Sequence, residues 1–319
     1  MDSVSTSVPT TGDTCRQAPS ALGGCWARWL DWLGERALPH FGQLSIWLLL
    51  GVAAFESCVP AQVFDVVTLR DWPRQGTATI LFWLPAEVLN SPVTFFVLRG
   101  LLLVGISLWL FQKLLPWSCW LTVFAFTAVW AVHVENSWHT NHCFHMANSL
   151  LFIQALWMTI CGHDIRAAIR EKRYWSTPLY PRWVTLAAIA YIGVFHMAAG
   201  LSKLSYSGPD WANGTSLQLW AHLWGYRWSP TTQLILHSRA FTQFLQVGTL
   251  IIEVVGLLAL FPRLRTWIGL ATVGFYLGVL ATFSFGFHFN LLFTALYLLP
   301  VERWVQQYVQ RRSSAVPNQ

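Results

Sequence analysis

The segment that decides the fold reads FHMAAGLSKL at residues 195–204, and WANG follows at residues 211–214. The first run closes a long apolar stretch. On a helix, His196, Gly200 and Lys203 stand four and three residues apart, so they share one face. A histidine and an ammonium on a membrane helix are costly unless their face meets protein or water. We therefore expect the other polar residues of the apolar segments to gather around this face.

The composition is that of a membrane protein. Of the 319 residues, 55% are hydrophobic and 11% are charged, and the mean hydropathy is +0.45. A soluble domain carries about 25% charged residues. The 20 tryptophans fit the same class, because indole rings collect at the membrane–water boundary. The net charge of +6 does not indicate a nucleic-acid partner, because the basic residues stand in short loops between apolar segments.

The apolar segments predict an all-α, polytopic bundle of about eight spanning helices, each of roughly 20 residues. The candidate spans are 44–63, 93–112, 115–134, 142–161, 183–202, 243–261, 266–284 and 287–301. Three parts follow from this reading. Residues 1–41 hold a disordered tail and an interfacial amphipathic helix, residues 42–302 form the membrane domain, and residues 303–319 form a basic tail.

The distribution of positive charge predicts the orientation of the bundle. With eight spans, 14 of the 20 lysines and arginines stand on the side that also holds both termini. Cytoplasmic loops carry such an excess, so we expect both termini in the cytoplasm. Segments 135–141 and 203–241 then share the non-cytoplasmic face, and most residues capable of chemistry fall in or near them.

Histidines cluster after the third predicted span. His139, His142 and His145 are spaced three residues apart, which could place three ring nitrogens around a metal ion. Neither a carboxylate nor a cysteine is placed to complete the shell, so wetted interfacial histidines are the simpler interpretation and we expect no metal. A histidine-based metal enzyme stays an alternative.

Lys203 is open to two interpretations on its residues alone. A desolvated lysine can become neutral and act as a general base, whereas a lysine at a helix end can also extend to the interface as an anchor. Glu56 and Glu253 stand inside apolar segments and need a partner there. Either could counter Lys203 or a histidine, or make a purely structural hydrogen bond. The aromatic run 283–290, which includes Phe287, could wall a flat ligand or pack as core.

Several motifs together resemble the membrane segment of the vitamin K-dependent gamma-carboxylases and the wider group called the horizontally transferred transmembrane (HTTM) domain. The run GLSKL at 200–204 is similar to the family's Gly-X-X-Lys-Leu, and an Asp-Trp pair and a glycine follow it in both. Further similarities are Ser137-Trp138 with Asn141-His142, Glu253 where the family carries aspartate, and FSFG at 283–286.

The resemblance implies a reaction and a site. In that family the lysine matching Lys203 deprotonates vitamin K hydroquinone, oxygen adds, and the resulting strong base takes a proton from glutamate before CO2 attacks. The histidine matching His142 assists the lysine. Carried over, Trp138 and Asn141 line a quinol pocket on the non-cytoplasmic face.

The sequence also departs from the family. Tyr276 stands near the position of a family histidine, and Ser202 replaces a second lysine. The family's large lumenal region has no counterpart in the 319 residues, so a protein or peptide substrate stays unknown.

The resulting expectation is a multi-pass membrane enzyme that acts on a lipid-soluble quinol, such as reduced vitamin K, with Lys203 as base and His142 as partner. Its other partners are membrane lipids. We expect the substrate to meet Trp138, Asn141, His196, Trp211, Glu253 and Phe287. The alternative is a non-enzymatic carrier or scaffold that keeps the fold.

Overall fold

The computed structural model describes residues 39–58, 91–135, 144–160, 181–283 and 287–315, with the single positions 85 and 88. Within these ranges the chain is mainly helical, and Gly225 and Phe283 form one isolated bridge. The predicted all-α class is therefore confirmed for the described residues.

The helices differ widely in length, and two short 3-10 helices interrupt the series. In chain order they are α2 (Pro39–Cys58), α4 (Pro92–Leu110), α5 (Trp117–Glu135), α6 (His145–Ile160), α8 (Arg182–Ser207), η4 (Gly208–Ala212), α9 (Thr215–Trp224), α10 (Pro230–His237), α11 (Arg239–Val254), η5 (Gly256–Leu260), α12 (Pro262–Thr282), α13 (His288–Leu298) and α14 (Val301–Ala315).

Each of the eight predicted spans overlaps one of these helices, with ends that differ by a few residues. Three helical segments are long and apolar enough to cross a membrane: α4, α8 together with η4, and α12. Shorter apolar helices lie in α2, α5 and α13. These helices are compatible with an integral membrane protein. The number of eight spans and the side of the membrane on which the termini lie stay predictions.

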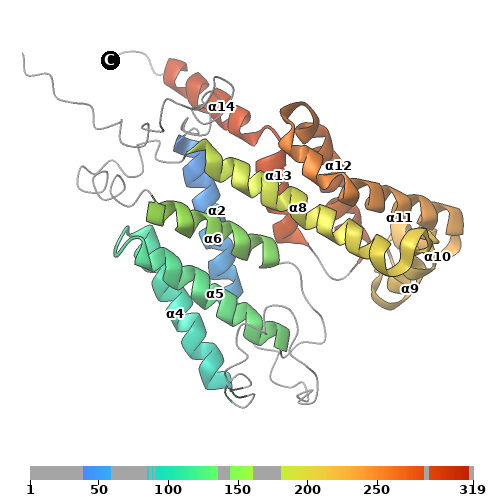
Figure 1. Cartoon of the computed structure of the whole chain (residues 1–319), viewed down its shortest axis with the longest axis horizontal. Helices are drawn as coiled ribbons and strands as arrows, with labels where there is room; N and C mark the ends of the chain where they lie inside the picture. Colours follow the sequence, from blue (N-terminus) through green and yellow to red (C-terminus); the bar gives the residue numbers. More distant parts are fainter. Residues whose placement is uncertain are drawn as a thin grey trace, which may run out of the picture.

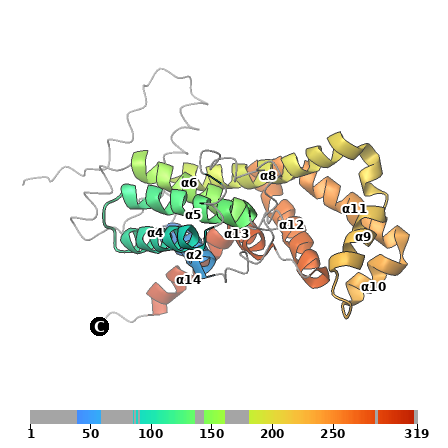
Figure 2. The same cartoon turned by 90° about the horizontal axis from the view of Figure 1, so that it is seen from below.

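The helices form an elongated bundle. Helix α8 runs from beside α6 toward α9, α10 and α11 (Figure 1). Helices α4 and α5 lie at one end of the molecule, and α9, α10 and α11 lie at the other (Figures 1 and 2). The main apolar core lies between α2, α4, α5, α6, α8 and α13, where large side chains such as Trp109, Phe126 and Phe293 are fully buried.

Proline and glycine set several helix ends near the site. Pro262 begins α12, where its missing N–H is not needed for a helical hydrogen bond. Gly208 ends α8 with a φ of +58°, a conformation that favours glycine and turns the chain into η4. Ser238 caps α11, because its hydroxyl accepts a hydrogen bond from the Phe241 N–H.

The predicted span 243–261 is not one continuous α-helix, because α11 ends at Val254 and η5 follows. At this break the backbones of α8 and η5 approach very closely. A methyl group added at Gly256 would lie 2.9 Å from both the Gly193 oxygen and the His196 Cβ, and one added at Gly200 would lie 3.0 Å from the Glu253 Cβ. The small residues therefore allow α8 to lie directly against the end of α11.

Gly256→Ala is expected to lower the free energy of unfolding by about 1–3 kcal/mol, because the added methyl group meets backbone that cannot move away cheaply. Gly248→Ala on α11 is the matched control, since no atom lies within 4 Å of its added methyl group. The control should be neutral or stabilising by up to about 1 kcal/mol. Thermal unfolding of the purified variants measures both, and equal midpoints would contradict the close approach.

The expected outer segment 203–241 contains three helices that the sequence analysis does not predict: η4, α9 and α10. The turn between α9 and α10 is bonded to the carboxyl end of α12. The Tyr226 N–H donates to the Thr282 oxygen at 2.8 Å, and the Ser229 hydroxyl donates to the Ala281 oxygen at 2.8 Å. These bonds satisfy carbonyls that the end of a helix leaves without intrahelical partners.

At the termini, the expected tail and interfacial helix of residues 1–41 fall largely outside the described residues. The basic tail expected at 303–319 is helical as far as Ala315, as part of α14.

Candidate functional site

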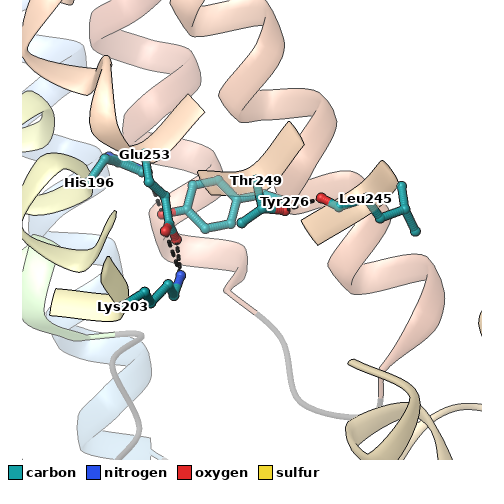
Figure 3. Close-up of polar contacts among 6 residues, drawn as sticks. All are labelled: His196, Lys203, Leu245, Thr249, Glu253 and Tyr276. Carbon is teal, nitrogen blue, oxygen red and sulfur yellow. Dashed lines mark hydrogen bonds and ion pairs between the residues drawn. The ribbon is translucent and has the colours of Figure 1, made fainter. Parts of the chain in front are cut away.

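Lys203 and Glu253 form the centre of the candidate site. Lys203 lies on α8, four residues before this helix ends, and Glu253 lies one residue before the end of α11. The Lys203 Nζ donates to both carboxylate oxygens of Glu253 (Figure 3). The side chain of Glu253 is 7% exposed and that of Lys203 is 27% exposed. The carboxylate is therefore enclosed by protein, whereas the Lys203 side chain is partly exposed.

Trp211 adds an aromatic surface beside the amine. The Lys203 Nζ lies 4.7 Å from the centre of the Trp211 ring, within the range of a cation–π contact. Trp211 is in η4, which begins directly after the turn at Gly208. This turn explains how a residue eight positions after Lys203 can return to its side chain. The sequence analysis named Lys203, Glu253 and Trp211 separately, and the structure brings the three together.

A second polar pair begins at His196, about two turns before Lys203 on the same helix. The His196 Nδ1 is 2.7 Å from the Ile192 oxygen. The His196 Nε2 is 2.9 Å from the hydroxyl of Tyr276, and both side chains are drawn in Figure 3. A carbonyl oxygen only accepts, so Nδ1 carries the proton; in the neutral ring, Nε2 then accepts from Tyr276. Both side chains are buried, His196 at 4% and Tyr276 at 3% exposure.

The face of α8 that carries His196, Gly200 and Lys203 meets three neighbouring elements. His196 contacts η5 and α12, while Gly200 and Lys203 both meet Glu253 of α11. The predicted shared face is therefore turned toward protein. This placement explains how a histidine and a lysine are accommodated on a long apolar helix.

Gln246 holds the segment that carries Trp211. Its amide oxygen accepts from the Gly214 N–H at 2.6 Å, and its amide nitrogen donates to the Trp211 oxygen at 3.0 Å and to the Ser216 hydroxyl at 2.6 Å. The side chain is 2% exposed. Sequence reasoning did not single out Gln246, although its spacing of seven residues from Glu253 places both on one face of α11.

Gln246→Ala is expected to reduce the free energy of unfolding by about 2–4 kcal/mol, because it leaves buried backbone groups without their partner. Gln233→Ala is the control, since this glutamine is exposed and its side-chain amide donates to the Arg227 oxygen at 2.7 Å. Chemical unfolding of both variants provides the comparison. Similar losses for the two would show that Gln246 does not hold the η4–α9 segment.

The remaining predicted site residues are only partly described. Trp138, Asn141 and His142, together with His139, lie outside the described residues. Phe287 directly precedes α13, and its ring centre is 5.9 Å from that of Tyr276, which places it next to the His196–Tyr276 pair.

Glu56 and His145, the one histidine of the 139–145 series that the structure describes, lie on other helices than Lys203. Glu56 is buried on α2, and Arg99 of α4 is its electrostatic partner. His145 begins α6, and its ring centre lies 4.1 Å from that of Trp130. Among the described residues no three histidine, cysteine, aspartate or glutamate side chains gather in a way that could hold a metal ion.

The Lys203–Glu253 pair can hold and move one proton. As ammonium and carboxylate it has no net charge, and transfer of one proton to Glu253 leaves a neutral amine beside a neutral acid. In low-dielectric surroundings the charged form of the pair costs more free energy than in water. The charged and neutral forms of a buried pair therefore differ less in free energy than they would in water. A neutral amine is a base.

Comparison of the chain with protein-family models, with curated proteins and with solved structures found no match. The likeness to the HTTM group accordingly stays a prediction from the motifs.

Proposed function

We propose that the protein is a membrane enzyme that acts on a lipid-soluble quinol, with Lys203 as the general base. The observation that carries the proposal is the pairing of one partly exposed lysine with an enclosed carboxylate. Three apolar helices long enough to cross a membrane give a lipid-soluble substrate a route to such an amine. A lysine that served only as an anchor at a helix end would extend into water and would need no buried partner.

Trp211 is the aromatic residue that a quinol bound at Lys203 would meet, since its ring centre lies 4.7 Å from the Lys203 Nζ. In the proposed first step, the Lys203 amine accepts the proton of a quinol hydroxyl and becomes an ammonium. Glu253 holds the pair's other proton as a neutral acid, so the negative charge stays on the quinol oxygen, and the carbonyl oxygen of the Glu253 carboxyl group accepts a hydrogen bond from the new ammonium.

The other residues have supporting roles in this proposal. Both ring nitrogens of His196 make hydrogen bonds and its side chain is buried. We therefore give His196 and Tyr276 a structural role, in which they hold α8 against α12 next to the site. Phe287 packs near Tyr276 and extends the aromatic wall. His142, Trp138 and Asn141 take the roles that the resemblance gives them, as polar partner of the base and as lining of the quinol pocket.

One observation favours the alternative of a carrier or scaffold. Among the described residues, the partners of Lys203 are Glu253 of α11 and Trp211 of η4. The contacts that would adjust the basicity of the amine therefore also hold α11 and η4 against α8. A purely structural lysine would show the same geometry. An experiment that distinguishes the two functions must therefore separate the structural role of Lys203 from its role as a base.

The experiment uses the purified full chain in phospholipid vesicles, supplied with vitamin K hydroquinone and oxygen. One quinol and one O2 give one quinone epoxide and one water, and reversed-phase chromatography separates the epoxide from the quinone. We expect epoxide formation by the wild type and its loss in both Lys203→Ala and Lys203→Arg. Equal turnover in all three proteins would refute the base role, and absence of epoxide with the wild type would favour the scaffold.

A further inference from the structure

Helix α9 exposes an unusual number of large apolar side chains for a ten-residue helix. Its buried side is formed by Ala221 and by Leu217, which packs with Ile235 of α10. The opposite side of α9 exposes four large apolar residues: Leu219, Trp220, Leu223 and Trp224. Trp228, in the turn that follows α9, is 76% exposed. We call these five residues the α9 apolar face.

The α9–α10 hairpin is fixed at one end of a candidate spanning helix. Besides the two bonds of Tyr226 and Ser229, the Thr232 hydroxyl donates to the Thr282 oxygen at 3.0 Å. Helix α12 ends at Thr282, and Figure 2 shows the hairpin beside that end. The hairpin therefore lies at the level where a spanning α12 would leave the hydrocarbon.

The neighbouring helix α11 is polar inside and apolar outside. Thr242, Gln246 and Glu253 are buried, whereas Phe244 and Ile251 are more than half exposed. A helix at the surface of a water-soluble protein shows the opposite pattern. An exposed apolar face is therefore a general property of this end of the molecule and continues beyond α9.

We propose that the α9 apolar face inserts into the headgroup–acyl boundary of the leaflet that borders the carboxyl end of α12. Tryptophan is favoured at that depth, and an amphipathic helix lying there buries its apolar side by about 5–10 Å. The partner is the phospholipid monolayer itself. On α10, Gln233 and His237 are exposed next to one exposed apolar residue, Leu234, and the proposal places these two polar side chains in water.

Two features favour lipid over a second protein. The hydrogen bonds to α12 set the depth of the hairpin at the boundary, where lipid is the solvent that surrounds any exposed side chain. The exposed apolar residues of α12, including Leu270 and Leu277, are on the helix to which the hairpin is bonded, so they are continuous with a lipid-facing surface. This inference does not depend on the proposed quinol chemistry.

The test attaches a nitroxide spin label to Leu223→Cys on α9 and, as a control, to His237→Cys on α10. The full chain, with its six native cysteines replaced by alanine, is reconstituted in phosphatidylcholine vesicles. Collision rates of the label with oxygen and with a water-soluble nickel complex are compared. We expect the oxygen rate to exceed the nickel rate at Leu223→Cys and to fall below it at His237→Cys.

Other outcomes overturn the proposal. A nickel rate at Leu223→Cys as high as that at His237→Cys would place the face in water. A label there that neither reagent reaches would place the face in a protein contact, such as a second copy of the chain. If the cysteine-free protein does not fold, a maleimide polymer tag is used with the native cysteines in intact vesicles. An additional tag, relative to wild type, is then expected at His237→Cys but not at Leu223→Cys, and its appearance at both would overturn insertion.

Discussion

Glu253→Ala is expected to destabilise the folded protein by about 3 kcal/mol, the lower end of the cost of removing one partner from a buried ion pair. The lower end applies because the Lys203 side chain is 27% exposed and water can solvate part of the remaining charge. The alanine leaves the ammonium of Lys203 without its only described carboxylate partner. Unfolding of the purified protein in mild detergent measures the loss.

Thr249→Ala is the control for this variant. Thr249 lies one turn earlier on α11, and its hydroxyl bonds only to the Leu245 oxygen of the same helix, at 2.8 Å (Figure 3). Its loss should cost no more than about 1 kcal/mol. If Glu253→Ala unfolds under the same conditions as Thr249→Ala, the ion pair does not contribute to joining α8 and α11.

Lys203→Arg is expected to slow quinol turnover by about 10²–10⁴-fold while the protein stays folded, because removal of a general base costs that much. Arginine keeps the positive charge opposite Glu253 and can bind the carboxylate with two N–H groups. It cannot become neutral in a protein, so it cannot accept the proton of the substrate. Epoxide formation and the unfolding midpoint are measured on the same preparation.

Lys113→Arg is the matched control, since Lys113 is an exposed lysine between α4 and α5. It should change neither quantity. A Lys203→Arg protein that is folded and fully active would remove the general base from the mechanism. A protein that is inactive only because it unfolds would leave the ion pair as a structural element, as the scaffold alternative predicts.

Much of the helical organisation follows from hydropathy. Apolar runs of the right length predicted the positions of the helices, because burying backbone groups in an apolar environment requires helical hydrogen bonds. The break between α11 and η5 was not predicted. At this break Gly256 lies close to Gly193 and His196 of α8. These two residues are about 60 positions earlier in the chain, and no local sequence pattern indicates that they lie next to Gly256.

The site was predicted in part for the same reason. The spacing predicted that His196, Gly200 and Lys203 share one face of a helix. Their contacts in the structure agree with that prediction. The choice of Glu253 over Glu56 as the partner of Lys203 could not be made from sequence, since both stand in apolar segments. That choice depends on which helices pack together, and α8 packs against α11 and η5.

The α9–α10 hairpin was missed because its helices are short and lie in a stretch rich in serine, glycine and tryptophan, which predicted a loop. The structure stabilises them from outside, through Gln246 and through the carbonyl groups that end α12. Contacts of this kind are long-range and have no periodic signal. The inward polar face of α11 was the one local feature that could have indicated them.

The exchange of the two charges tests most directly whether Lys203 meets Glu253. Lys203→Glu alone places two carboxylates together, and Glu253→Lys alone places two ammonium groups together, so each should lower the unfolding midpoint strongly. The double variant restores an opposite pair, and we expect its midpoint to return most of the way to that of the wild type. A double variant whose loss equals the sum of the two single losses would contradict the pair, because residues that do not touch have additive effects.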